Sequence, residues 1–234
     1  MSKKIYIFLW QTCVCLLLSI LYQCSNGNPE NVQDFFIGLY GNWSGYFDYL
    51  PSLMWVTPLV TAYTFCGMSL SEELGSRRYM TLPRFTYWKD FIKRRFHETF
   101  FNALIVGVGS IGAIGCCGLA AMIFYGRISE IRITVLLWAI VLYLVNLFFM
   151  VFLQATLFLC NWDNRMVMGL LVLLLIPAFC MEKANPVIAW FCPGIWNSVA
   201  FSSVVRAGGF HPIIIIGIEL LFCIGGIGLW RKVQ

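Results

Sequence analysis

Six apolar segments, each close to the length that crosses a membrane, take up most of this chain. We place them at about residues 5–22, 49–70, 99–126, 133–160, 166–181 and 212–230. A helix needs about 20 apolar residues to cross the hydrocarbon layer. Lipid accepts only helices or closed barrels because it offers no hydrogen-bond partner to the backbone, and the segments lack the alternation of barrel strands. The sequence therefore predicts an all-α polytopic membrane protein whose residues 1–234 form a single transmembrane domain.

The cationic residues indicate how the six predicted spans are oriented. With both termini in the cytoplasm, 12 of the 16 Lys and Arg residues lie inside and 4 lie outside. Cytoplasmic loops carry such an excess of Lys and Arg. We therefore expect a multi-pass protein of the plasma membrane, of bacterial type, with both termini inside. The net charge of +5 then reflects orientation in the lipid bilayer, and we expect no nucleic-acid partner.

Residues 186–205 are uncharged and long enough to cross the membrane, which leaves two interpretations open. Pro193 and Gly194 interrupt the segment in its middle. Broken helices occur at membrane depth where they are buried in protein or line a cavity. We expect extracellular re-entrant helices between spans five and six, with Pro193 and Gly194 at an outer gate. The alternative is a seventh span, which would place Arg231 and Lys232 outside.

Sequence motifs for nucleotide binding or catalysis receive no support from their context. Gly107, Gly109 and Gly112 spell G-x-G-x-x-G, but they lie within an apolar span with no strand before it. Gly115 and Gly118 continue the series at every third residue, so we expect a smooth ridge for close helix packing. The chain contains no P-loop and no H-E-x-x-H motif. We therefore expect no enzyme activity and no cofactor on this chain.

The ten cysteines do not suggest a metal site, because none forms a C-x-x-C pair. Most lie inside apolar segments, where cysteine packs as a small apolar residue. Cys24 and Cys192 lie where an oxidising exterior would reach them, and a bridge between them is one possible pairing.

Glu219 is a carboxyl residue inside the last apolar segment. It lies about 10 Å from the outer end of that segment at 1.5 Å per residue. A charged side chain at mid-membrane costs on the order of 3 kcal/mol and usually faces the interior of the helix bundle. Two interpretations stay open, a residue of a translocation pathway or gate and a packing contact to a polar residue of another span. The polar residues available as partners are Asn102, Asn146 and Gln154.

Residues 71–95, between the second and third predicted spans, concentrate the charge of the chain. They hold 7 of the 16 Lys and Arg residues and 3 of the 11 carboxylates. Pro83 interrupts them, so we predict two helical pieces with a turn at 82–84. In the second piece, Phe85, Trp88, Phe91 and Ile92 form an apolar stripe opposite Lys89, Asp90, Lys93 and Arg94. Anionic lipid would attract the basic residues of this segment. It does not account for the acidic pair Glu72 and Glu73, for Gly75 or for the turn at residues 82–84.

Two groups of residues in this segment stand out, namely Glu72, Glu73 and Gly75, and then Leu82-Pro83-Arg84. In this order they resemble the loop after the second span in ABC-2-type permeases, which are the membrane subunits of type-2 ABC exporters. Six spans with outer re-entrant helices also match that family. The chain departs from the family pattern because Arg84 follows Pro83 directly and the first outer loop is longer. By length and context, it is similar to the small permeases of antimicrobial-peptide (lantibiotic-type) export and immunity systems.

The resemblance implies a permease that exports its substrate while a separate P-loop ATPase binds ATP and Mg²⁺. Its coupling residues would be Glu72, Glu73, Gly75, Arg77, Arg78, Leu82, Pro83, Arg84 and Trp88. A second permease copy or a sister permease would complete the pathway. The aromatic and Met content favours an amphipathic substrate, either a peptide or a lipid-like molecule. Other classes remain as alternatives, namely a non-transport membrane protein (an immunity or assembly factor acting by direct binding) and an intramembrane enzyme.

Overall fold

The computed structural model describes residues 3–26, 49–71, 88–125, 133–159, 166, 167, 169 and 212–230. Apart from the helical residues 166, 167 and 169, the described residues form five helices, and the expectation of an all-α chain is confirmed for this part. The helices are α1 (Lys3–Asn26), α3 (Tyr49–Ser71), α5 (Trp88–Tyr125), α6 (Ile133–Leu159) and α11 (Pro212–Trp230). They coincide with five of the six predicted apolar segments. Most of segment 166–181 and all of the predicted re-entrant segment 186–205 lie outside the described residues.

Three of the helices contain a stretch that is long and apolar enough to cross a membrane. These stretches are Lys4–Cys24 in α1, Lys93–Ala120 in α5 and Leu136–Phe158 in α6. α3 and α11 contain shorter apolar stretches, Val56–Leu70 and Ile213–Gly228. The protein is therefore embedded in a membrane.

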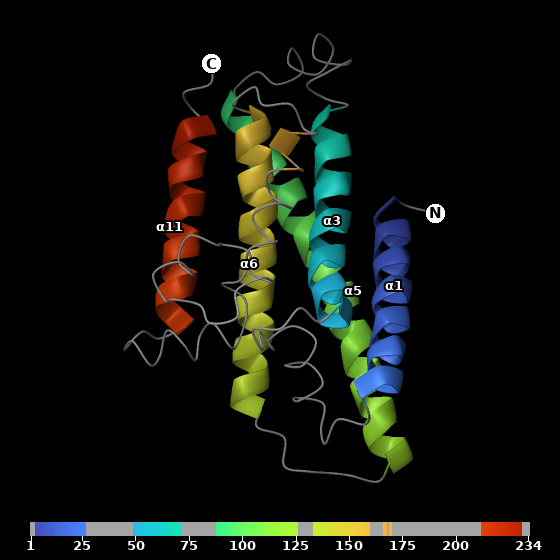
Figure 1. Cartoon of the computed structure of the whole chain (residues 1–234). Helices are drawn as coiled ribbons and strands as arrows, with labels where there is room; N and C mark the ends of the chain where they lie inside the picture. Colours follow the sequence, from blue (N-terminus) through green and yellow to red (C-terminus); the bar gives the residue numbers. More distant parts are fainter. Residues whose placement is uncertain are drawn as a thin grey trace.

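The five helices lie side by side in one bundle (Figure 1). α1 packs against α3 and α5, whereas α6 packs against α3, α5 and α11. α6 therefore holds a central place, and α11 lies at one edge (Figure 1). From α1 to α6, each described helix runs opposite to the one before it, but α6 and α11 run in the same direction (Figure 1). The chain that joins α6 to α11 thus starts at one end of the bundle and finishes at the other.

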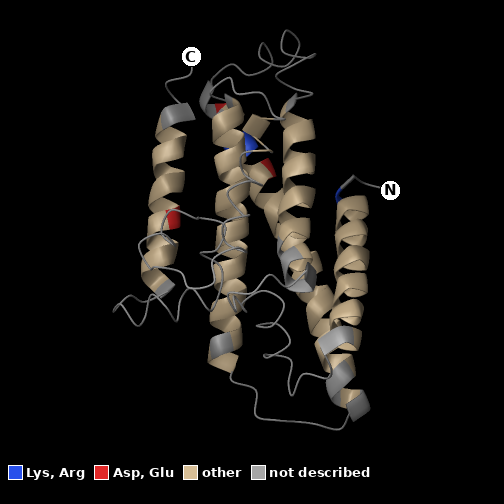
Figure 2. Ribbon diagram, in the orientation of Figure 1, with Lys and Arg blue, Asp and Glu red and all other residues tan. Residues whose placement is uncertain are grey.

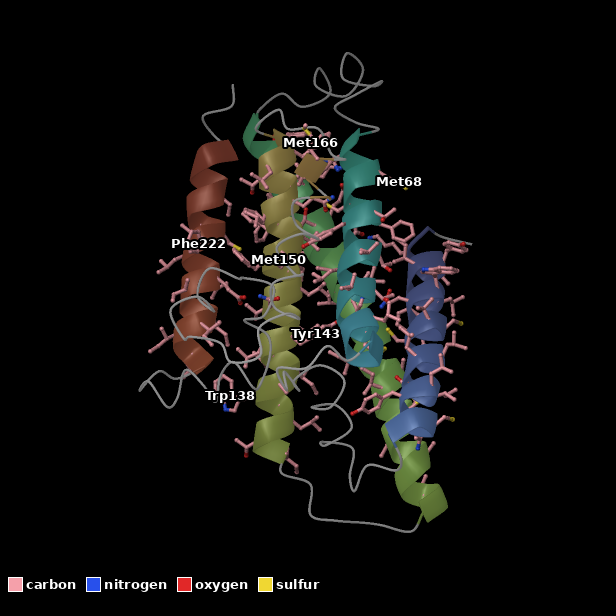
Figure 3. The ribbon with its side chains drawn as sticks, viewed as in Figure 1. Met68, Trp138, Tyr143, Met150, Met166 and Phe222 are labelled. Carbon is pink, nitrogen blue, oxygen red and sulfur yellow. The ribbon has the colours of Figure 1, made fainter. Side chains whose placement is uncertain are left out.

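Apolar side chains fill the space between the helices, and many others face outward (Figure 3). Tyr63 of α3, Ile114 of α5, and Tyr143 and Met150 of α6 are among those buried in the core. Leu17, Met68, Ile123, Leu221 and Phe222 are among those exposed on the outside of the bundle. An apolar exterior suits a protein whose solvent is lipid.

α5 is longer than the predicted third span, because it also includes residues 88–95 of the charged segment 71–95. It runs over 38 residues, so the helical piece predicted after Pro83 and the span predicted from residue 99 form one element. Of the four residues expected to form the apolar stripe in that piece, Phe91 is the one whose side chain is described. Phe91 is buried, whereas Asp90, Lys93 and Arg94 are exposed.

The glycines of α5 do not form the single packing ridge that the sequence predicts. A Cβ atom at Gly107 would lie 2.5 Å from Leu144 of α6, and one at Gly109 would lie 3.1 Å from the nearest side-chain atom of α1. At Gly112 and Gly115 a Cβ would meet nothing within 4 Å. Three residues advance by about 300° on a helix of 3.6 residues per turn. A glycine at every third position therefore drifts by about 60° per step, so Gly112 and Gly115 lie off the interface that Gly109 occupies.

Candidate functional site

Hydrogen bonds from buried amide side chains join neighbouring helices of the bundle. Gln11 of α1 donates from Nε2 to Oγ of Ser110 in α5 at 2.9 Å. Gln154 of α6 donates from Nε2 to the backbone carbonyl oxygen of Tyr63 in α3, also at 2.9 Å. Such bonds between membrane helices contribute about 0.6–2 kcal/mol each. These two contacts position helices and contain no reactive group.

Arg95 links α5 to the end of α3, although the sequence counts it among the charges of a cytoplasmic segment. Its guanidinium is 2% exposed. Nη1 donates to Oε2 of Glu98 at 2.7 Å and to Oγ of Ser69 in α3 at 3.3 Å. The guanidinium carbon lies 5.6 Å from the ring centroid of Phe91. Burying a cation is costly unless it is paired and hydrogen-bonded. Glu98 supplies the opposite charge, and Glu98 and Ser69 both accept hydrogen bonds from Nη1.

The contact between Arg95 and Ser69 holds together the two helices that flank residues 72–87. Ser69 lies two residues before the end of α3, and Arg95 lies in the second turn of α5. The ribbon shows most of the described charge at this end of the bundle (Figure 2). Of the predicted coupling residues, Trp88 is described, as the first residue of α5. The following predicted site residues lie outside the described residues: Glu72, Glu73, Gly75, Arg77, Arg78, Leu82, Pro83, Arg84, Pro193 and Gly194.

Glu219 is buried between α11 and α6, as the sequence predicts for a carboxyl that faces the bundle. It is the only acidic residue of α11, which shows as the isolated red turn on that helix in Figure 2. Asn146 of α6 donates from Nδ2 to Oε1 of Glu219 at 2.6 Å. Both side chains are 1% exposed. Asn146 is thus the partner among the three polar residues that the sequence offers.

The second carboxyl oxygen of Glu219, Oε2, is buried and accepts no hydrogen bond within the described part of the chain. No described Lys or Arg residue pairs with this carboxyl, since both described ion pairs involve Glu98. Cys223, one turn further along α11, is also buried. Within the described part of the chain, the carboxyl therefore has one neutral donor, at Oε1, and one buried oxygen, Oε2, that accepts no hydrogen bond.

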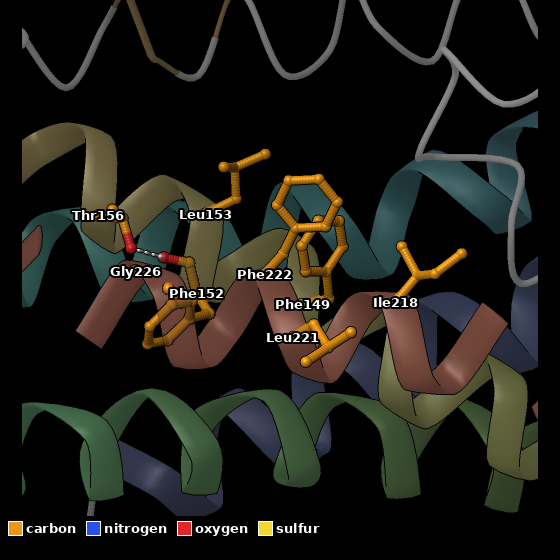
Figure 4. A pocket seen from close by; sticks show the side chains of 9 residues that line it. Phe149, Phe152, Leu153, Thr156, Ile218, Leu221, Phe222 and Gly226 are labelled. Atoms are coloured by element: carbon orange, nitrogen blue, oxygen red, sulfur yellow. Dashed lines mark hydrogen bonds between the residues drawn. The ribbon is translucent and has the colours of Figure 1, made fainter. Parts of the chain in front are cut away.

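A groove of about 470 Å³ lies between the same two helices, α6 and α11 (Figure 4). We call it the α6–α11 groove; its lining residues are Phe149, Phe152, Leu153, Thr156, Ile218, Leu221, Phe222, Gly225 and Gly226. The hydroxyl of Thr156 donates to the carbonyl oxygen of Phe152 at 2.9 Å, so the one polar side chain of the lining bonds within its own helix. The groove is consequently apolar over its whole length.

The close approach of α11 to α6 at one end of the groove depends on Gly226. A Cβ atom there would lie 2.6 Å from Cε1 of Phe152 and 3.3 Å from Oγ1 of Thr156. Gly225, in contrast, has nothing within 4 Å of its Cβ position, because it faces the open groove. The Gly225-Gly226 pair is the signal in the sequence that could have indicated this contact, but it does not identify the partner helix.

Among the described residues, no group of three or more His, Cys, Asp or Glu side chains could hold a metal ion. Cys24 lies exposed near the end of α1, and Cys192 lies outside the described residues, so the possible bridge between them stays a prediction. No protein-family model, curated protein or solved structure matches this chain.

Proposed function

We propose that this chain is the membrane-spanning permease subunit of an ATP-driven ABC exporter. It moves an amphipathic substrate, a peptide or a lipid-like molecule, out of the cell. ATP and Mg²⁺ bind to a separate P-loop ATPase, and a second permease copy or a sister permease completes the pathway. The proposal rests on the resemblance of residues 71–95 to the coupling loop of ABC-2-type permeases.

The observation that carries the proposal is the link between Arg95 and Ser69 at the base of that loop. A loop that transmits the closure of an ATPase has to move its flanking helices together. Arg95 ties α3 to α5 by a hydrogen bond and is itself held by Glu98. Force applied to residues 72–87 would therefore reach both helices at once, which is what coupling to a motor requires.

The proposed topology has six spans, with both termini and residues 71–95 in the cytoplasm. The start of α1, the end of α3, the start of α5 and the end of α11 point toward the same end of the bundle (Figure 1). Because α6 and α11 run in the same direction, a chain joining them has to travel the length of the bundle, as a fifth span at 166–181 would. The excess of Lys and Arg supports placing this end in the cytoplasm.

Copurification tests the class of the protein. The chain is expressed with a tag in its native cells and isolated in mild detergent together with its bound proteins. We expect a P-loop ATPase at a stoichiometric level. Repeated isolation of the intact chain without any such ATPase would refute the transporter proposal and favour an immunity or assembly factor.

Substitution in the loop tests the coupling assignment. Glu73→Ala and Arg84→Ala are each expected to lower substrate-stimulated ATP hydrolysis by the complex at least severalfold, because both residues belong to the part that resembles the coupling loop. Arg231→Ala is the matched control, since it removes a charge near the C-terminus on the same predicted side. Unchanged hydrolysis in both loop variants would refute the assignment.

A further inference from the structure

We propose that the α6–α11 groove together with Glu219 is a binding site for a cationic amphiphile. The apolar part of the ligand lies in the groove, and its ammonium or guanidinium group binds Oε2 of Glu219. That this ligand is the exported substrate rests on the proposed function. That such a ligand binds here rests only on the geometry of α6 and α11.

The carboxyl of Glu219 provides the reason for a positive charge in the ligand. Oε1 accepts a hydrogen bond from Asn146, but Oε2 is buried without a donor among the described residues. A buried carboxylate is expensive unless it is paired and its oxygens are hydrogen-bonded. A ligand that brings both a positive charge and an N–H donor supplies what the site lacks.

The position of the groove brings an apolar ligand next to this carboxyl. The lining of the groove on α11 begins at Ile218, one residue before Glu219, and continues to Gly226. On α6, the lining begins at Phe149, one turn after Asn146. On both helices the polar pair therefore lies within one turn of the residues that line one end of the groove. Leu221 is 68% exposed and Phe222 is 62% exposed on the outer rim, so a ligand can enter from the side of the bundle.

Two aromatic rings, those of Phe149 on α6 and Phe222 on α11, face each other in the lining of the groove. The ring centroids of Phe149 and Phe222 are 6.2 Å apart, and the ring planes are inclined at 54° (Figure 4). The face of an aromatic ring attracts a cation within about 6 Å of its centroid. The two rings therefore provide a second favourable contact for a cation bound in the groove.

Other ligand classes match these features less well. An anionic headgroup would meet the carboxyl with like charge, and a neutral alkyl chain would fill the groove but leave Oε2 unpaired. A metal ion bound by several acidic, His or Cys side chains finds no such group among the described residues. The cationic amphiphile is the class that uses both the apolar groove and the carboxyl.

Photolabelling of the full chain in phosphatidylcholine nanodiscs, without any ATPase, tests the site. The probes are dodecylammonium and dodecanol that carry the same diazirine on the alkyl chain. We expect saturable labelling of the peptides from α6 and α11 by the ammonium probe at concentrations where the alcohol labels weakly. Glu219→Gln keeps an acceptor for Asn146 but removes the charge, so it should weaken ammonium binding about tenfold or more, as the loss of a charged hydrogen bond does. Its effect on the alcohol should be small.

A second variant tests the groove without touching the carboxyl. Gly225→Leu places a side chain in the open groove, where a Cβ meets nothing within 4 Å, and should weaken the binding of both probes. Gly217→Leu is the matched control, because its Cβ position on the same helix is also open and does not line the groove.

The outcomes separate the two proposals. Ammonium labelling that does not saturate, that is unchanged by Glu219→Gln, or that is matched by dodecanol would overturn the binding site. None of these results depends on an ATPase, so they leave the copurification test of the exporter untouched. A chain that binds the ammonium probe but never associates with an ATPase would retain the site and lose the transporter function.

Discussion

Asn146 of α6 and Glu219 of α11 form a 2.6 Å hydrogen bond between two side chains that are each 1% exposed. α11 is the edge helix and packs mainly against α6. Apolar contacts within lipid offer little hydrophobic driving force for helix association. A single buried polar contact therefore does much to set how α11 is rotated and at what depth it lies against α6.

We first predict that removal of the donor is more harmful than neutralisation of the acceptor. Asn146→Ala removes the hydrogen-bond donor that the described residues give the buried carboxyl and should lower the free energy of unfolding by about 1–2 kcal/mol. Glu219→Gln preserves an acceptor oxygen and should cost less. Unfolding in mixed micelles, followed by circular dichroism, measures both. Additive effects in the double variant would contradict a direct bond between the two residues.

The second prediction concerns Arg95, which is buried but has a partly exposed partner. Glu98→Gln weakens the pairing of the buried guanidinium and should lower the free energy of unfolding by roughly 1–3 kcal/mol. Arg95→Met removes the buried charge itself and fills the same space with apolar atoms, so it should cost less, as buried ion pairs replaced by apolar residues often do.

Arg94→Met is the control for this comparison. Arg94 also contacts Glu98, at 3.1 Å, but its side chain is 55% exposed. Exposed pairs contribute about 0–1 kcal/mol, and this substitution should have a correspondingly small effect on unfolding. A loss as large as that of Glu98→Gln would show that the burial of Arg95 is not what matters at this contact.

The third prediction compares two glycines of α5 that have the same backbone but different surroundings. Gly107→Ala brings a methyl group to 2.5 Å from Leu144 of α6, so α5 and α6 have to separate or Leu144 has to change its rotamer. We expect a loss of about 1–3 kcal/mol from overpacking. Gly112→Ala meets open space and should be neutral or stabilising by up to about 1 kcal/mol from helix propensity. Equal thermal stability of the two variants would contradict the packing described for Gly107.

These residues also show what the sequence can and cannot predict. The apolar segments predict the described helices because span length follows from bilayer thickness. The cost of a carboxyl in lipid likewise predicts that Glu219 faces the bundle. The drift of the glycine series follows from 3.6 residues per turn and was predictable from the same sequence.

The contacts between helices could not be predicted in the same way. Arg95 pairs with Ser69 across 26 residues of chain, and this pairing depends on how far α3 and α5 slide along each other. Arg95 follows Phe91 by four residues, so the two side chains lie on the same, buried face of α5. This spacing could have predicted the burial of Arg95, which the charge count treats only as a cytoplasmic charge. The groove likewise depends on the rotation of α11, which no periodicity in the sequence determines.

The last prediction tests the proposed topology by labelling single cysteines from outside intact cells. Cys24 is exposed and lies two residues before the end of α1, a helix that starts at the proposed cytoplasmic end. Kept as the only cysteine, it should react with a membrane-impermeant maleimide. A lone cysteine at Gln234, four residues after the end of α11, should react only after the membrane is permeabilised. Labelling of residue 234 in intact cells would refute the six-span topology, because a seventh span between α6 and α11 is the change that carries the C-terminus outside while leaving Cys24 in place.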